Sequence, residues 1–119
     1  MKIENKIDIL LCEMANLFPE NTGLPVVVWV QEKSSDKIEK NKYKLPRIKV
    51  MTKKGKANIF QSVSVSIEDN PKVLNGKLSS TIFNSAKKWI LLNKSSLLKH
   101  WNQEIDTVGL IHKLKKLHK

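Results

Sequence analysis

The sequence predicts an α+β fold in which a small, mostly antiparallel sheet of 3-4 strands is covered by C-terminal helices. Two observations lead to this prediction. Short β-branched and alternating segments fill the chain up to residue 78, and apolar residues then recur at helical steps of three and four from residue 79 to residue 117. A chain of 119 residues is long enough for one core, so we expect a single domain over residues 1–119.

The first segment, residues 3–18, has its apolar residues at steps of three and four. This spacing favours an amphipathic helix that ends before Pro19, because the residue before a proline avoids the helical region. The pattern is short, so a strand over part of the segment stays open as the alternative. Residues 19–23 are rich in turn-forming types, with Gly23 placed to accept left-handed backbone angles.

Four strands are predicted, at residues 26–32, 46–53, 62–68 and 72–78. The first is a continuous β-branched and aromatic run, which is typical of a strand buried on both faces. The second and third alternate between polar and apolar residues, as half-buried strands do. The fourth is short and is interrupted by Asn75-Gly76, a hairpin signal. Residues 33–45 between the first two strands are polar and without periodicity, which indicates a mobile, lysine-rich loop.

The helical block is expected to contain three helices, because residues that cap or end helices interrupt the apolar pattern. These residues are Ser79 or Ser80 before the first helix, Asn93 after it, Ser95 or Ser96 before the second, and Asp106 or Thr107 before the third. The tryptophans in the strands and helices fall in line with aliphatic residues, so we expect Trp29, Trp89 and Trp101 to be core anchors.

The net charge of +11 is concentrated in two segments of the chain. Residues 33–56 carry ten basic residues against two acidic ones, and residues 87–119 carry eight against two. A concentrated positive field suits an anionic partner, RNA or DNA, and a merely solvated lysine-rich surface stays open as the alternative. Lysines suit irregularly spaced phosphates, and Tyr43 among them can stack on an exposed base. The candidate nucleic-acid-binding residues are therefore Lys42, Tyr43, Lys44, Arg47, Lys49, Lys53, Lys54 and Lys56.

Two other functions stay open. The apolar helix faces fit a protein-interaction module with a small protein partner. A metal-independent ribonuclease toxin is the other alternative, in which Tyr43, Arg47, Lys49 and His100 would supply the acid, the base and the phosphate contacts. The sequence has no glycine-rich phosphate loop and no paired carboxylates in a pocket-like setting, which favours a non-enzymatic regulatory or nucleic-acid-binding protein.

No cofactor, metal or membrane association is expected. The three histidines share no metal-ligand spacing, and the one cysteine lacks a partner for a structural zinc site. No apolar run reaches the roughly 20 residues that span a bilayer. Acidic residues interrupt the N-terminal apolar patch and no cleavage site follows it, so we expect a cytoplasmic protein.

Residues 78–117 contain the pattern W-I-x-L-N-K-x-x-L-L-x-x-W, formed by Trp89, Ile90, Leu92, Asn93, Lys94, Leu97, Leu98 and Trp101. In this pattern the chain resembles a bacterial family of small proteins, a domain of unknown function. Residues 22–30 and 63–67 look like the strands of the same family. Some members stand beside a second small gene in a toxin-antitoxin-like pair, so the resemblance implies this fold and a regulatory role. It brings no established catalytic residues.

Overall fold

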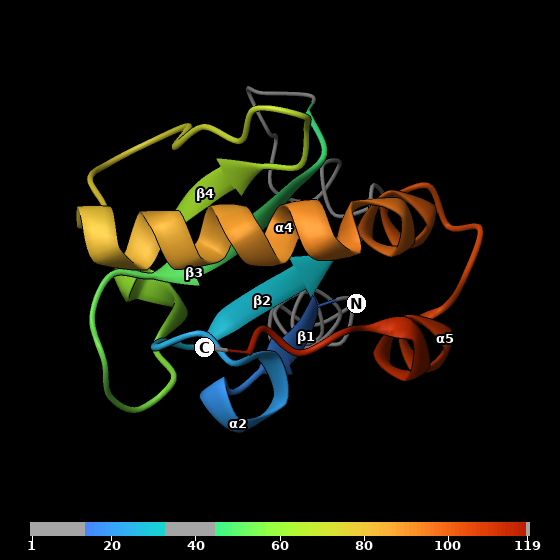
Figure 1. Ribbon diagram of the computed structural model, residues 1–119, viewed down its shortest axis with the longest axis horizontal. Helices are drawn as coiled ribbons and strands as arrows, with labels where there is room; N and C mark the ends of the chain where they lie inside the picture. The colour runs from blue at the N-terminus through green and yellow to red at the C-terminus, as the bar shows by residue number, and fades with distance from the viewer. Residues whose placement is uncertain (1–13, 33–44, 119) are drawn as a thin grey trace, which may run out of the picture.

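The computed structural model describes residues 14–32 and 45–118 of the protein. It has the expected α+β fold, an antiparallel four-stranded sheet followed by C-terminal helices (Figure 1). In chain order the elements are β1 (Met14–Leu17), α2 (Pro19–Thr22), β2 (Val28–Gln31), β3 (Arg47–Met51), the 3-10 turn η1 (Ile59–Gln61), β4 (Ser62–Ser66), α4 (Ser80–Trp101) and α5 (Thr107–Lys113).

The sheet is a simple meander with strand order β1-β2-β3-β4 and antiparallel neighbours throughout. The register aligns Val30 with Ile48, and Ile48 with Val65. Successive side chains of a strand point to opposite faces, so one face of the sheet collects apolar residues. The interior members of this face are Val28, Val30, Ile48, Val50, Val63 and Val65, all of them buried.

Helix α4 lies across this apolar face (Figure 1). Its buried residues follow helical steps of three and four and join the same core cluster as the sheet. They include Ala86, Trp89, Ile90 and Leu97. The expected burial of Trp29, Trp89 and Trp101 is confirmed.

The helix predicted for residues 3–18 is wrong at its C-terminal end, where Met14–Leu17 form strand β1. The strand alternative is correct for these four residues, which pair antiparallel with β2. A helical spacing this short gives way when a neighbouring strand offers a complete hydrogen-bonding edge. The rest of that prediction, residues 3–13, lies outside the described residues.

The fourth predicted strand, residues 72–78, is reduced to one bridge between Val73 and Val65. Beyond this bridge the backbone amide of Ser64 in β4 pairs with a side chain, because the Asn75 Oδ1 accepts its hydrogen bond at 2.7 Å. A side chain that replaces a backbone carbonyl ends the ladder. The sheet therefore stops at β4 in this part of the chain.

The first two predicted C-terminal helices are one helix of 22 residues. Ser79 caps it as expected, since its Oγ accepts from the Ile82 amide at 3.3 Å. The predicted break at Asn93 is wrong, because the apolar stripe continues to Leu97 and burial of that stripe outweighs the weak helix propensity of asparagine.

Asn93 is instead buried in mid-helix and holds the C-terminal tail, residues 114–118. Its Nδ2 donates to the Lys115 carbonyl oxygen at 3.0 Å, and its Oδ1 accepts from the Lys115 amide at 2.7 Å. The last helix begins as predicted, with Asp106 Oδ1 accepting from the Gly109 amide at 2.7 Å, and α5 ends at Lys113. The tail then runs back to α2, where the Leu117 amide donates to the Thr22 carbonyl oxygen at 2.7 Å.

Gly23 is where the tail passes closest to the backbone of another segment. Its φ of 81° is left-handed, and a Cβ at this position would overlap the Leu117 carbonyl oxygen. We expect Gly23→Ala to lower the free energy of unfolding by more than about 1 kcal/mol, because strain and overlap act together. Chemical denaturation measures this change.

Gly55→Ala is the matched control for that measurement. Gly55 also has a positive φ, 141°, but a Cβ there meets nothing within 4 Å. Equal destabilisation by the two variants would show that the close approach of the tail contributes nothing.

His100 joins the end of α4 to the start of α5. It is buried, and its Nε2 lies 3.1 Å from the Thr107 Oγ1. Burial lowers the pKa of this imidazole below its ordinary value, and the nearby Asp106 carboxylate opposes that shift only in part.

A lowered histidine pKa means that the unfolded chain binds the proton more readily than the folded one. The free energy of unfolding should therefore fall as the pH drops below about 6.5, the ordinary histidine pKa. Denaturation at several pH values measures this slope. In His100→Gln the slope between about pH 6.5 and 5 should shrink, and an unchanged slope would assign it to other groups.

Candidate nucleic-acid interface

The structure distributes the predicted nucleic-acid-binding residues over separate places. Lys42, Tyr43 and Lys44 lie outside the described residues. Arg47 begins β3, and the last three lysines follow the end of the strand at Met51. The length of β3 therefore separates Arg47 from these lysines by roughly 13 Å, at about 3.3 Å per residue. Arg47 is buried, Lys49 is half-buried in mid-strand, and the last three lysines, Lys53, Lys54 and Lys56, are exposed beyond the end of the strand.

Arg47 is held inside the protein, with only 2% of its surface exposed. Its guanidinium carbon lies 5.2 Å from the ring centroid of Trp101, the last residue of α4, and its Nη1 donates to the Leu45 carbonyl oxygen at 3.3 Å. A guanidinium over an indole face is attracted by the ring quadrupole. Arg47 therefore ties β3 to the end of α4 and presents little surface to a ligand.

Lys49 lies on the side of β3 away from Ile48 and Val50. In the register it stands between Trp29 and Ser64. Gln31, one pair further along the same side, is buried, and neither polar atom of its side chain has a hydrogen-bond partner within the described residues.

The exposed lysines belong to the loop between β3 and β4, residues 52–61, which we call the hairpin loop. Its base is closed by the Gln61 carbonyl oxygen, which accepts from the Thr52 amide at 2.8 Å and from the Thr52 hydroxyl at 3.1 Å. Its far side is ordered by Asn58, whose Oδ1 caps η1 by accepting from the Phe60 amide at 3.1 Å. The loop thus has a defined shape although most of it is solvent-exposed.

Phe60 is the residue of this loop that sequence reasoning missed. The turn η1 directs Ile59 against the core and leaves Phe60 94% exposed, the most exposed of the large apolar residues in the described part of the chain. The sequence does contain a signal for it, since an aromatic residue follows a lysine cluster by four positions and belongs to no apolar repeat. Phe60, Lys53, Lys54 and Lys56 together form the candidate interface.

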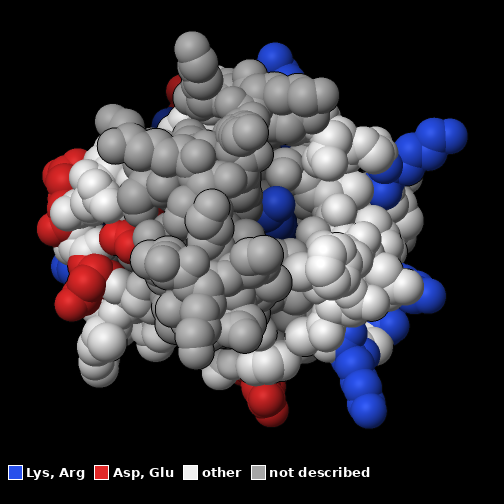
Figure 2. Space-filling model, turned by 180° about the vertical axis from the view of Figure 1, so that it is seen from behind, with Lys and Arg blue, Asp and Glu red and all other residues white. Residues whose placement is uncertain are grey.

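Charge is separated along the sheet. The hairpin loop contains three lysines and no acidic residue. Glu32 and Glu68 follow β2 and β4 at the opposite end, where β3 begins. Figure 2 shows the result on the back of the molecule, where most basic side chains gather toward one side and most acidic ones toward the other. Such a separation orients an approaching anion toward the basic end.

The residues predicted for the ribonuclease alternative are not shown together at a surface that a ligand could reach. His100 of the ribonuclease alternative is buried and lies within hydrogen-bonding distance of Thr107, and Tyr43 lies outside the described residues.

Among residues 14–32 and 45–118, no group of three or more histidine, cysteine, aspartate or glutamate side chains is placed to hold a metal ion. Within the same ranges, no helix has the length and hydropathy needed to cross a membrane.

Comparison with known proteins returned no matching family model, no matching curated protein and no matching solved structure. The resemblance drawn from the tryptophan-containing helix therefore stays a prediction.

The position of Arg47 predicts a structural effect. Arg47→Ala should lower the free energy of unfolding by about 2 kcal/mol or more, because it removes a buried stacking contact and leaves a void beside Trp101. Lys53→Ala, at an exposed position of the hairpin loop, should stay within about 0.5 kcal/mol of the unchanged protein. Equal effects of the two substitutions, measured by denaturation, would contradict the buried role of Arg47.

Proposed function

We propose that this protein is a non-enzymatic regulatory protein that binds single-stranded nucleic acid through its hairpin loop. One observation carries the proposal: a phenylalanine ring 94% exposed stands on an ordered loop whose charged residues are all lysines. Proteins that bind single strands without strong sequence preference combine an aromatic platform for bases with cations for the phosphates.

The exposure of Phe60 supports a ligand that covers its ring. Burying a phenylalanine side chain is worth about 1.5–3 kcal/mol, and this gain is unused in the free protein. Stacking of one base on an aromatic side chain is worth about 1–3 kcal/mol, so a base would recover a comparable amount. The neighbouring lysines add attraction to phosphates on either side of that base.

A single strand fits the loop better than a duplex does. Bases in a duplex are stacked on one another, so their faces are closed to Phe60. Reading of base edges in a duplex groove relies on bidentate side chains such as arginine. Arg47, the one arginine of the chain, is buried under Trp101 and cannot take that role. We therefore expect weak dependence on sequence and strong dependence on salt.

Fluorescence anisotropy with a labelled single-stranded RNA tests the proposal. Phe60→Ala should weaken binding by roughly tenfold, the value of one stacked base, without changing the salt dependence. Replacing Lys53, Lys54 and Lys56 with glutamine should weaken binding and flatten the plot of log affinity against log salt by about 2, at about 0.7 per phosphate contact.

The matched control replaces Lys72, Lys88 and Lys99 with glutamine, three exposed lysines on other elements. It removes the same charge. Equal weakening of RNA binding by the two triple variants would therefore show that binding depends on net charge and not on the lysines of the hairpin loop. Undiminished RNA binding by Phe60→Ala would show that no base stacks on Phe60. Tight binding of a protein instead of RNA at Phe60 would also overturn the proposal.

A further inference from the structure

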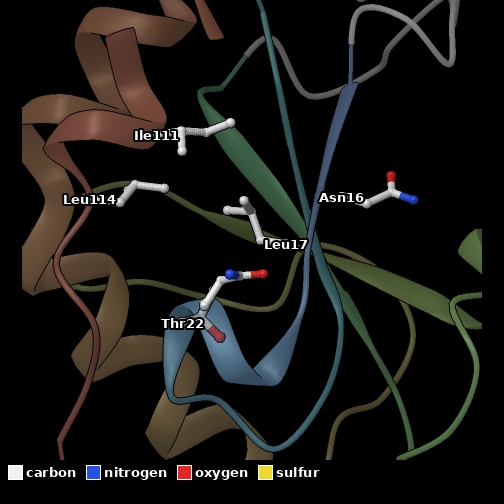
Figure 3. A pocket seen from close by; sticks show the side chains of 6 residues that line it. Asn16, Leu17, Thr22, Ile111 and Leu114 are labelled. Atoms are coloured by element: carbon white, nitrogen blue, oxygen red, sulfur yellow. The ribbon is translucent and has the colours of Figure 1, made fainter. Parts of the chain in front are cut away.

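A second feature, unrelated to the hairpin loop, is a groove between β1, α2 and the C-terminal part of the chain (Figure 3). It measures about 280 Å³, and it is lined by Asn16, Leu17, Asn21, Thr22, Ile111 and Leu114. Figure 3 shows Leu17, Ile111 and Leu114 around the same space, whereas the Asn16 side chain points away from them. Three apolar side chains therefore line the groove beside the polar Asn21 and Thr22.

The two walls of the groove are fixed to the rest of the molecule. One wall begins at β1 and continues into α2, whose Thr22 carbonyl oxygen accepts from Leu117. The other wall is the end of α5 and the tail, which Asn93 holds at Lys115 through two hydrogen bonds. A groove with fixed walls can bind a ligand without first ordering a loop, which saves conformational entropy.

Apolar side chains extend from the groove onto the exposed side of α5. Ile111 is 50% exposed and Val108, one turn earlier, is 62% exposed, although Leu110 of the same helix is fully buried. Residues at positions i and i+3 of a helix lie side by side, so the two form one apolar strip with the groove. The strip enlarges the apolar surface of the groove, and it is large contiguous apolar surfaces that mark interaction sites.

The size of the groove limits what it can hold. Sites for small molecules and cofactors usually measure about 300–1,000 Å³ and enclose most of the ligand, so this groove is at or below the small end. It suits one or two branched side chains that project from a larger partner. A nucleic acid would find no aromatic side chain in its lining for a base to stack on.

The rim is basic. Four exposed residues interleave with Ile111 and Leu114 or follow them along the chain, namely His112, Lys113, Lys115 and Lys116. On the other wall Glu20 is the acidic neighbour of Asn21. A second copy of this chain would bring a net charge of +11 toward that rim, so self-association is disfavoured.

We propose that the groove binds an acidic peptide segment of a partner protein, with a branched apolar side chain of the segment inserted between Leu17, Ile111 and Leu114. Carboxylates on either side of the inserted residue face the basic rim. This interaction is independent of the hairpin loop, and it adds a protein partner to a protein that binds nucleic acid elsewhere.

Selection from a displayed library of random peptides tests the proposal on the full chain. The enriched peptides should combine valine, isoleucine or leucine with flanking aspartate and glutamate. A synthetic peptide of the enriched sequence should bind in anisotropy measurements, and Ile111→Asp should weaken it by about tenfold or more through loss of the apolar contact and repulsion of the acids.

Leu92→Asp is the matched control, because Leu92 is also partly exposed, at 43%, but lies on α4 outside the groove lining. It introduces the same charge and should change peptide affinity by less than about twofold. Thermal unfolding of both variants verifies that they fold, and both should bind single-stranded RNA alike.

Several outcomes would overturn the proposal. Enrichment of no peptide, or of peptides without acidic residues, would show that the groove does not bind an acidic peptide. Equal weakening by Ile111→Asp and Leu92→Asp would place the peptide on the general positive surface. A dimer in sedimentation that Ile111→Asp dissociates would identify a second copy as the occupant.

Discussion

The packing of α4 on the apolar face of the sheet is the contact on which the other features depend. The interior of the face consists of valines and Ile48 from neighbouring strands, and the apolar stripe of the helix, which includes Trp89, Ile90 and Leu97, packs in the same core. Each fully buried side chain of this kind contributes about 1.5–3 kcal/mol. That sum keeps α4 continuous through Asn93, which then needs a buried partner for its amide. The tail supplies the partner, and the position of the tail in turn creates the groove beside β1.

The meander topology has a comparable effect on charge. Because β3 and β4 are consecutive and antiparallel, the lysines that follow β3 are gathered in one hairpin loop at one end of the sheet. Glu32 and Glu68 fall at the other end for the same reason. The hydrogen bonds from Thr52 to Gln61 close the base of this loop, and the turn η1 leaves Phe60 exposed on it. The exposure of Phe60 on a loop with three lysines is thus a consequence of strand order and loop closure.

The sequence was sufficient for the fold class because strand alternation and helical spacing both depend on neighbouring residues. It was insufficient where a distant partner decides the outcome. Met14–Leu17 became a strand because β2 lies beside them, and Asn93 stayed helical because Lys115 satisfies its side chain. The exposure of the candidate binding residues was partly predictable for similar reasons. Lys53, Lys54 and Lys56 are exposed in a turn that glycine marks, whereas the burial of Arg47 depends on Trp101, which is 54 positions away in the chain.

An NMR titration of the labelled protein with a single-stranded RNA is the sharpest test of whether the hairpin loop contacts single-stranded nucleic acid. The ring protons of Phe60 and the amides of residues 52–61 should shift together as RNA is added, with ring-current changes typical of stacking. The amides of α4 and of the groove should stay in place. Shifts confined to another surface, or no shifts at low salt, would contradict the account.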